Sequence, residues 1–252
     1  GRSVAAAAAH NLKPSVLELG GKSPNLIFAD CDLETAIRQG VAHCFRNAGQ
    51  SCNAASRMLV ERSIYDRAVR LAVSAAEAVE VGPPQEAGAH IGPLITRRQY
   101  DRVQNFILEG IDEGAWLVAG GPGRPDGFSA GYFVRPTVFA DVAPHMRIAR
   151  EEIFGPVLTI SPFDDEDDAV RQANDTHYGL AAYLQTTDTG KADRISRRLR
   201  AGMVQVNGTS RAAGAPFGGV KASGIGREAG IWGIRSFQTI KSISGSAAVI
   251  SG

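Results

Sequence analysis

Residues 15–47, SVLELGGKSPNLIFADCDLETAIRQGVAHCFRN, decide the fold that this sequence predicts. Two short apolar runs, Ser15–Leu19 and Asn25–Phe28, are separated by the pair Gly20-Gly21 and by polar residues. Asp32 then precedes a stretch in which apolar residues recur at helical spacing, at Leu33, Ala36, Ile37, Val41, Cys44 and Phe45. This spacing predicts a helix that Asp32 caps and that runs to about residue 47. The stretch therefore predicts a strand, a glycine turn, a second strand and a helix.

The alternation continues along the rest of the chain. We expect further strands at 58–61, 116–119, 133–139, 157–163, 182–185 and 203–207, with a last one at 236–244. We expect a long amphipathic helix that Ser63 caps, and other helices at 2–10, 97–113, 164–174, 188–200 and 227–234. Strands that alternate with helices are typical of an α/β layer fold with a largely parallel sheet.

The composition excludes several classes of protein. The 252 residues carry a formal net charge of +1, which gives no support for binding to nucleic acid or to a charged membrane surface. The sequence has no apolar run of membrane-spanning length. Its three cysteines are spaced irregularly, unlike those of a disulfide framework or a zinc site. We therefore expect a protein of a reducing compartment, the cytoplasm, without a metal site.

Cys52 stands in residues 45–56, FRNAGQSCNAAS, just past the predicted helix. Cys44 lies on the apolar stripe of that helix and is expected in the core, whereas the acidic neighbours of Cys31 should raise its pKa and weaken it as a nucleophile. Small neighbours around Cys52 let a substrate approach its sulfur, and nearby backbone N–H groups can receive an oxyanion. Taken alone, Cys52 is either a buried structural thiol or a nucleophile.

Glu18 lies near the end of the first predicted strand, and Leu19 separates it from two glycines. The strand ends of α/β sheets are where binding sites form. Loss of water around a carboxylate there raises its pKa toward that of a general base. The alternative is an edge carboxylate that pairs with Lys22.

A second acidic segment, residues 151–156, reads EEIFGP. A carboxylate in such a corner can hold a vicinal diol with two hydrogen bonds, and Phe154 can flank a flat ring. The alternative is a solvated acidic turn that precedes a strand.

Three motifs together resemble the aldehyde dehydrogenase superfamily. They are LELGGKSP at 17–24, FRNAGQSCNAAS at 45–56 and EEIFGPV at 151–157, in that order along the chain. Further blocks are similar to the family as well, namely GYFVRPTVF, NDTHYGLAAYLQT, AGMVQVN and PFGGVKASGIGREAG. The resemblance thus runs from about residue 1 to residue 242.

The resemblance implies a fold and a division into domains. The expected fold is a three-layer α/β catalytic domain of the aldehyde dehydrogenase type, with a largely parallel open sheet and flanking helices. It should occupy residues 18–241. Residues 1–17 would be a remnant of the NAD(P)-binding domain, and residues 242–252 a C-terminal oligomerisation strand or tail.

The resemblance also implies a mechanism with NAD or NADP as cofactor. Cys52 would attack an aldehyde, the thiohemiacetal would pass hydride to the nicotinamide, and water activated by Glu18 would hydrolyse the resulting thioester to a carboxylic acid. Glu152 would bind the hydroxyls of the nicotinamide ribose, and Phe154 would lie against the nicotinamide. The backbone N–H of Cys52 would hold the oxyanion.

The resemblance finally implies partners and limits. The partner is a small-molecule aldehyde, and the parent protein is expected to form a homodimer or homotetramer. The family's second oxyanion donor, an asparagine, and its dinucleotide turn would precede Gly1. Residues 1–252 alone should then have little activity, because losing one oxyanion donor slows such reactions about 100- to 1000-fold.

Three other functions remain open from the sequence. A CoA-acylating dehydrogenase would pass the acyl group to a thiol instead of water, although such members often lack the glutamate that Glu18 matches. A non-catalytic member would use the same fold for binding or structure. A cysteine hydrolase would use Cys52 without a nicotinamide cofactor.

Overall fold

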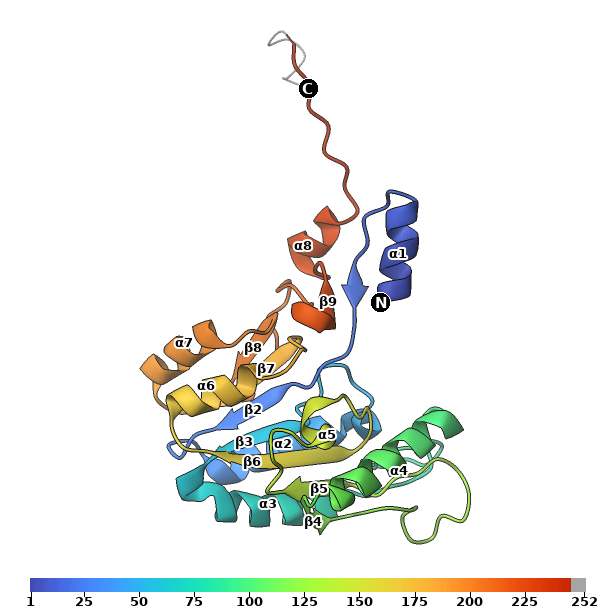
Figure 1. Ribbon diagram of the computed structural model, residues 1–252, viewed down its shortest axis with the longest axis vertical. Coiled ribbons are helices and arrows are strands. Elements are labelled where there is room, and N and C mark those ends of the chain that lie inside the picture. The colour runs from blue at the N-terminus through green and yellow to red at the C-terminus, as the bar shows by residue number, and fades with distance from the viewer. Residues whose placement is uncertain (246–252) are drawn as a thin grey trace.

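The computed structural model describes residues 1–245, in which strands and helices alternate along most of the chain (Figure 1). The strands are β1 Leu17–Glu18, β2 Pro24–Ile27, β3 Arg57–Glu61, β4 Trp116–Ala119, β5 Thr137–Ala140, β6 Val157–Phe163, β7 Ala181–Gln185, β8 Met203–Val206 and β9 Gly224–Ile225. The helices are α1 Arg2–His10, α2 Leu33–Phe45, α3 Tyr65–Glu77, α4 Arg97–Asp112, α5 Arg147–Arg150, α6 Glu166–Asn174, α7 Thr189–Arg198 and α8 Gly230–Arg235.

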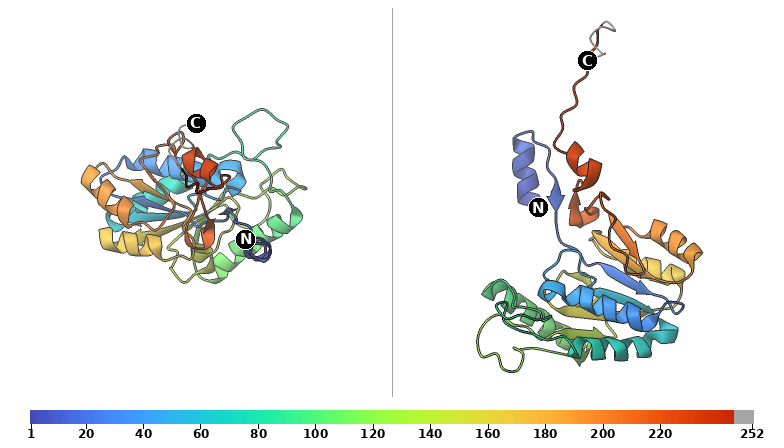
Figure 2. Two further views of the ribbon diagram at one scale, coloured as in Figure 1. Left: turned by 90° about the horizontal axis from the view of Figure 1, so that it is seen from above. Right: turned by 180° about the vertical axis from the view of Figure 1, so that it is seen from behind.

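A seven-stranded sheet forms the centre of the described residues, with the order β4-β5-β6-β3-β2-β7-β8. Every neighbouring pair is parallel except the antiparallel pair of β4 and β5. Helices α2 and α3 cover one face of this sheet, and α6 and α7 cover the other (Figures 1 and 2). The predicted α/β fold with a largely parallel sheet between helices is confirmed.

Alternate side chains of each central strand enter different cores. Ile27 and Met58 pack against α2 and α3, whereas Leu26 and Leu59 pack against α6 and α7. Successive side chains of a strand point to opposite faces, so a strand covered on both sides must be apolar throughout. This requirement explains why the central strands were visible in the sequence as continuous apolar runs.

Helix α2 begins and ends as its sequence dictates. Asp32 is its N-cap, and Asp32 Oδ1 accepts a hydrogen bond from the Thr35 amide at 3.3 Å, as predicted. The helix stops at Phe45 because Asn47 and Ala48 both adopt φ near +54°. This left-handed backbone turns the chain toward Cys52.

Two predicted boundaries are wrong. Ser63 does not cap α3: it lies in a 3₁₀ turn, Arg62–Ile64, and its hydroxyl donates to Glu61 Oε1 at 3.0 Å. The strand predicted at 133–139 begins only at Thr137.

The strand predicted at 236–244 is absent from the described residues. This segment extends away from the body of the molecule (Figure 1), and Phe237 and Ile240 are 92% and 97% exposed. A strand needs the hydrogen-bonding edge of a neighbour, and none runs beside this segment within residues 1–245. The predicted C-terminal oligomerisation strand or tail, 242–252, lies mostly outside the described residues.

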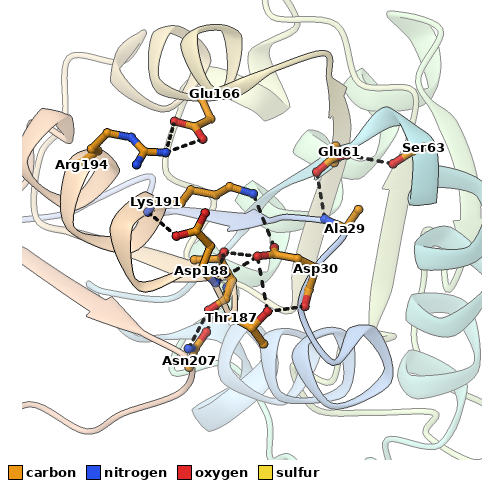
Figure 3. A network of polar contacts seen from close by, with 11 residues as sticks. Ala29, Asp30, Glu61, Ser63, Glu166, Thr187, Asp188, Lys191, Arg194 and Asn207 are labelled. Carbon is orange, nitrogen blue, oxygen red and sulfur yellow. Dashed lines mark hydrogen bonds and ion pairs between the residues drawn. The ribbon is translucent and has the colours of Figure 1, made fainter.

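A network of polar contacts closes the carboxyl ends of strands β2, β7 and β8 (Figure 3). Asp30, which follows β2, accepts hydrogen bonds from the Thr186 hydroxyl at 2.6 Å and from the Asp188 amide at 3.1 Å. Asn207 follows β8. Its side-chain oxygen accepts a hydrogen bond from the Thr186 amide at 3.0 Å, and its side-chain nitrogen donates one to the Thr186 carbonyl at 2.9 Å. Open α/β sheets usually bind ligands at this edge. Here the polar groups bind one another, so the network ties three strands together.

Candidate active site

The segments that carry the predicted site residues precede strands of the main sheet instead of following them. Glu18 comes before β2, Cys52 before β3, and Glu152 and Phe154 before β6. The expectation that Glu18 ends a strand of the central sheet is wrong. Its strand, β1, forms a separate two-stranded sheet with β9.

The glycine pair after Glu18 brings these segments together. A Cβ on Gly20 would lie 1.9 Å from Glu152 Oε2, and one on Gly21 would lie 2.8 Å from the Cys52 carbonyl oxygen. Both values are below any normal contact, so a side chain at Gly20 would displace the Glu152 carboxylate, and one at Gly21 would press on the backbone of Cys52. The motifs that hold Glu18, Cys52 and Glu152 therefore meet at one point in space.

Of the cysteines, Cys52 is the one whose surroundings suit a nucleophile. Burial and the carboxylates of Asp30 and Asp32 raise the pKa of Cys31 to about 11, and burial raises that of Cys44 to about 12. Cys44 is also fully enclosed, and its thiol donates to the Val157 carbonyl at 3.6 Å. The predictions of a core Cys44 and an unreactive Cys31 agree with this.

Cys52 itself is half-buried at a turn. Burial raises the pKa of its thiol, while the backbone N–H groups of Asn53 and of Cys52 itself lower it; the carboxylates of Glu152 and Glu18 raise it further. Backbone N–H groups that stabilise a thiolate at this position also suit a developing oxyanion. The turn thus offers both the sulfur and hydrogen-bond donors beside it.

Glu18 presents a carboxylate without a partner. Both of its oxygens are buried and make no hydrogen bond to any group in residues 1–245. Burial raises the pKa of Glu18, the Glu228 carboxylate adds to this rise, and the Arg227 guanidinium opposes it. A carboxylate with these surroundings is poised to take a proton.

The alternative pairing of Glu18 with Lys22 is wrong. Lys22 is only 1% exposed, and its ammonium has no hydrogen-bond partner among the described residues. Burial lowers the pKa of Lys22 to about 7.

The two adjacent glutamates of the 151–156 segment have different surroundings. Glu151 forms an ion pair with Arg147 at 2.7 Å, and this pair lowers its pKa. Glu152 turns inward, where Oε1 accepts a hydrogen bond from the Gly21 amide at 3.2 Å. Burial raises the pKa of Glu152, whereas the Gly21 amide and the Lys22 ammonium lower it. The alternative interpretation, a solvated acidic turn, therefore holds for Glu151 but not for Glu152.

Helix α4 fixes the backbone around Phe154. Gln99 Nε2 donates to the carbonyls of Ile153 and Phe154 at 3.0 and 2.9 Å. Arg102 Nη2 donates to the Glu152 carbonyl at 2.7 Å. These bonds hold Phe154 at φ near +59°, a conformation that costs energy for a residue with a Cβ. Gln99 and Arg102 were missed because polar residues on a helix surface carry no signal of a distant partner.

The residues present fit part of a nicotinamide nucleoside. Glu152 is a half-buried carboxylate with one fixed N–H partner, which leaves lone pairs for two hydroxyls. Phe154 follows Glu152 by two residues and is half-exposed. Within residues 1–245, His, Cys, Asp and Glu side chains nowhere gather in a group of three that could hold a metal ion. None of the helices described is both long enough and apolar enough to cross a membrane.

Comparison with known proteins gives a consistent picture. The model of the aldehyde dehydrogenase family matches residues 1–243. Among curated relatives, a 3-succinoylsemialdehyde-pyridine dehydrogenase from a Pseudomonas species is 48% identical over 245 residues, which are 97% of this chain and 51% of the relative. The chain spans about half the length of the curated relatives it matches.

Solved structures agree in fold. The aldehyde dehydrogenase of Bartonella henselae is 56% identical with a TM-score of 0.92, over 94% of this chain and 49% of that one. That of Mycobacterium tuberculosis, complexed with NAD+, is 50% identical with a TM-score of 0.91 and the same coverage. A mutant of aldehyde dehydrogenase C from Pseudomonas syringae, complexed with NAD+ and octanal, is 47% identical with a TM-score of 0.92, over 94% and 49%.

Proposed function

This chain belongs to the aldehyde dehydrogenase family, and we propose that it carries the catalytic domain of an enzyme that oxidises an aldehyde to a carboxylic acid with NAD or NADP. One observation carries the proposal. The Gly20-Gly21 pair, directly after Glu18 and Leu19, touches both the Glu152 carboxylate and the Cys52 carbonyl. A nucleophile, a base and a ribose-binding carboxylate thereby meet at one place.

Cys52 is the proposed nucleophile. Its thiolate attacks the aldehyde carbon, a carbon–sulfur bond forms, and the carbonyl oxygen becomes an oxyanion. The backbone N–H of Cys52 donates to this oxyanion, an interaction of the kind that accelerates acyl chemistry about 100- to 1000-fold. A nicotinamide cofactor held by Glu152 and Phe154 would supply the hydride acceptor for the former aldehyde carbon. The acyl group is then held on Cys52 as a thioester.

Glu18 is the proposed general base of the second step. Its carboxylate takes a proton from water, the hydroxide oxygen adds to the thioester carbon, and the Cys52 thiolate leaves as the carboxylic acid forms. The unpartnered oxygens of Glu18 support this role, because no neighbouring donor competes for the proton-accepting lone pairs within the described residues. The presence of Glu18 also argues against transfer of the acyl group to CoA, because CoA-acylating members often lack this glutamate.

Glu152 and Phe154 are the proposed cofactor contacts. The Glu152 carboxylate would accept hydrogen bonds from the ribose hydroxyls, and the Phe154 ring would lie against the nicotinamide. Helix α4 supports this assignment, because Gln99 and Arg102 hold residues 152–154 in place through three hydrogen bonds.

The division of the chain and its assembly are also proposals. We assign residues 18–241 to the catalytic domain, residues 1–17 to the cofactor-binding domain and residues 242–252 to oligomerisation. Helix α1, with no buried residue of its own, suits a segment that packs elsewhere. The exposed Phe237 and Ile240 suit a surface that a second subunit covers, so we propose a homodimer or homotetramer in the cytoplasm.

Product analysis tests the proposed function. The whole protein that carries this chain, and not residues 1–252 alone, is incubated with an aliphatic aldehyde and NAD+ or NADP+, with and without CoA, and the products are separated by mass spectrometry. We expect free carboxylic acid in both samples, and loss of turnover in Cys52→Ala but not in the matched variant Cys31→Ala. Acyl-CoA as the main product, or turnover by Cys52→Ala, would contradict the proposal.

A further inference from the structure

The turn after Cys52 is held from outside by two side chains that the proposed chemistry does not use. The Ala55 amide donates to His43 Nδ1 at 3.2 Å. The Tyr183 hydroxyl donates to the Asn53 carbonyl at 2.8 Å. His43 lies on α2 and Tyr183 on β7, so a helix and a strand from distant parts of the chain grip the same turn.

The two gripping side chains also support each other. Their rings pack with centroids 4.7 Å apart and an interplanar angle of 57°. Other backbone bonds of the turn engage different groups: the Ala54 amide donates to the Ser51 carbonyl at 3.0 Å, the Ser56 amide to the Ala54 carbonyl at 2.8 Å, and the Thr159 amide to the Ser56 carbonyl at 3.0 Å. Inside the turn, the Asn53 carbonyl therefore has its hydrogen bond from Tyr183, and the Ala55 amide has its hydrogen bond to His43.

The orientation of this turn decides how well the sulfur is stabilised as a thiolate. The amides of Cys52 and Asn53 act on Sγ and lower the pKa of the thiol against the effect of burial. The carbonyl of Asn53 and the amide of Ala55 lie one and two peptide units further on. If this backbone rotates, the Asn53 N–H changes its position relative to the sulfur, and its stabilising effect on the thiolate weakens.

We propose that His43 and Tyr183 are positioning residues for Cys52, which hold the turn so that its amides face the sulfur. The inference rests on the proposed role of Cys52 as nucleophile and extends it. It gives a role to the His43 ring nitrogen on α2 and to the Tyr183 hydroxyl on β7, which the proposed chemistry does not use.

The His43 contact depends on the protonation of the ring. A ring nitrogen accepts a hydrogen bond only while it carries no proton, so imidazolium must release the Ala55 amide. Burial lowers the pKa of His43, and the guanidinium of Arg46, directly after α2, lowers it further. Neutral His43, and hence the fixed turn, is therefore the form present at neutral pH.

The groups around His43 do not hold its ring in the protonated form. The ring borders a cavity of about 300 Å³, which Arg46, directly after α2, and Tyr183 from β7 also line. Strands β2 and β8 contribute the uncharged amides of Asn25 and Gln205 to the same cavity, and no carboxylate lines it. Acid should thus protonate His43 without a nearby anion to stabilise the charge, and so only below its ordinary pKa.

Three variants separate positioning from general packing. His43→Asn keeps an acceptor oxygen near the place of Nδ1 but does not titrate, whereas His43→Leu removes the acceptor. Tyr183→Phe removes only the hydroxyl that bonds Asn53. His145→Leu is the matched control, because it deletes an exposed imidazole elsewhere.

The readout is the rate of Cys52 alkylation by iodoacetamide from pH 5 to 9, measured for each cysteine peptide by mass spectrometry. Alkylation of Cys31 in the same samples serves as an internal control. No aldehyde or nicotinamide is added, so failure of the proposed enzymatic function leaves this test intact. Circular dichroism verifies that each variant is folded.

We expect His43→Asn and His145→Leu to match the unmodified protein above pH 7. At pH 7, His43→Leu and Tyr183→Phe should alkylate about fivefold more slowly, the equivalent of one hydrogen bond, with equal limiting rates at high pH. Below pH 6 the unmodified protein should lose reactivity more steeply than His43→Asn. Should His43→Leu fail to fold, Tyr183→Phe carries the test.

Two results would overturn the proposal. One is a wild-type alkylation profile in His43→Leu or Tyr183→Phe. The other is a His43→Asn profile that coincides with that of His43→Leu above pH 7, or with that of the unmodified protein below pH 6.

Discussion

Glu152 Oε1 accepts the amide N–H of Gly21 at 3.2 Å, across 131 positions of sequence. The bond joins the segment that carries Glu18 to the segment that carries Phe154, and it aims the Glu152 carboxylate away from bulk water. Because Gly20 has no side chain, the second oxygen of that carboxylate can lie directly over it. The relationship turns two separate motifs into one site.

Gly20→Ala tests the fit between this backbone and Glu152. The new Cβ would lie 1.9 Å from Oε2, so the carboxylate must move from its place. We expect the KM for the nicotinamide cofactor to rise about tenfold or more, as for a lost charged hydrogen bond. Gly92→Ala is the control, because a Cβ there meets nothing within 4 Å. Equal steady-state constants for the two variants would show that Glu152 does not meet the cofactor.

Gln99→Leu tests whether the fixed backbone at Phe154 matters. Without the Gln99 amide, the carbonyls of residues 153 and 154 lose their donor, and the strained φ of Phe154 can relax. We expect about a fivefold rise in the KM for the cofactor with the aldehyde KM unchanged. Gln104→Leu, on the same helix but bonded to Gly123, is the matched control and should leave both constants unaltered.

Glu18→Gln should slow hydrolysis of the acyl group while raising stability at neutral pH. The folded-state pKa of Glu18 lies above its ordinary value of 4.5, so its stabilising contribution is full below that pH and is lost as pH rises through the folded pKa. The neutral amide removes this loss, so the variant should be more stable than the unmodified protein above the folded-state pKa. Urea unfolding at several pH values measures it. A stability difference that grows toward acid pH would show that Glu18 is not disfavoured as an anion.

Lys22→Met should stabilise the chain, because Lys22 is a buried ammonium without a hydrogen-bond partner in the described residues. Its folded-state pKa is about 7 against 10.5 in the open chain, so its contribution is present above pH 10.5 and is lost as pH falls to about 7. The advantage of the methionine should therefore increase from pH 10 to pH 7 and then level off, at about 2 kcal/mol or more. Denaturant unfolding between pH 6 and 10 checks this, and a constant difference would contradict it.

The elements that bury apolar side chains could be predicted from the sequence. Strands such as β6, Val157–Phe163, and the capped helix α2 are specified by residues close together in the chain. The pairing of β1 with β9 could not be predicted, since it joins residues 17–18 to 224–225 and contains only two residues on each side. The short β1 therefore looked like part of the main sheet, and the site was expected at the carboxyl ends of the strands.

The candidate site likewise combines residues that could be predicted from the sequence with contacts that could not. Cys52, Glu18 and Glu152 could be selected because their motifs are local, and Cys44 could be set aside because of its place on an apolar helix face. The contacts that organise them could not, since each joins distant residues: Gly21 with Glu152, Gln99 with Phe154, and His43 with Ala55. Such contacts depend on the packed fold and leave no periodic pattern in the sequence.

The most direct test of the account is the position of the acyl group during turnover. The Glu18→Gln variant of the whole protein that carries this chain is mixed with an aliphatic aldehyde and oxidised nicotinamide cofactor, quenched in acid and digested. The masses of the cysteine peptides are then measured by mass spectrometry. The account predicts an acyl adduct on the Cys52 peptide, in an amount equal to the reduced cofactor formed, with Cys31 and Cys44 unmodified. Reduced cofactor without any adduct on Cys52, or an adduct on another cysteine, would contradict it.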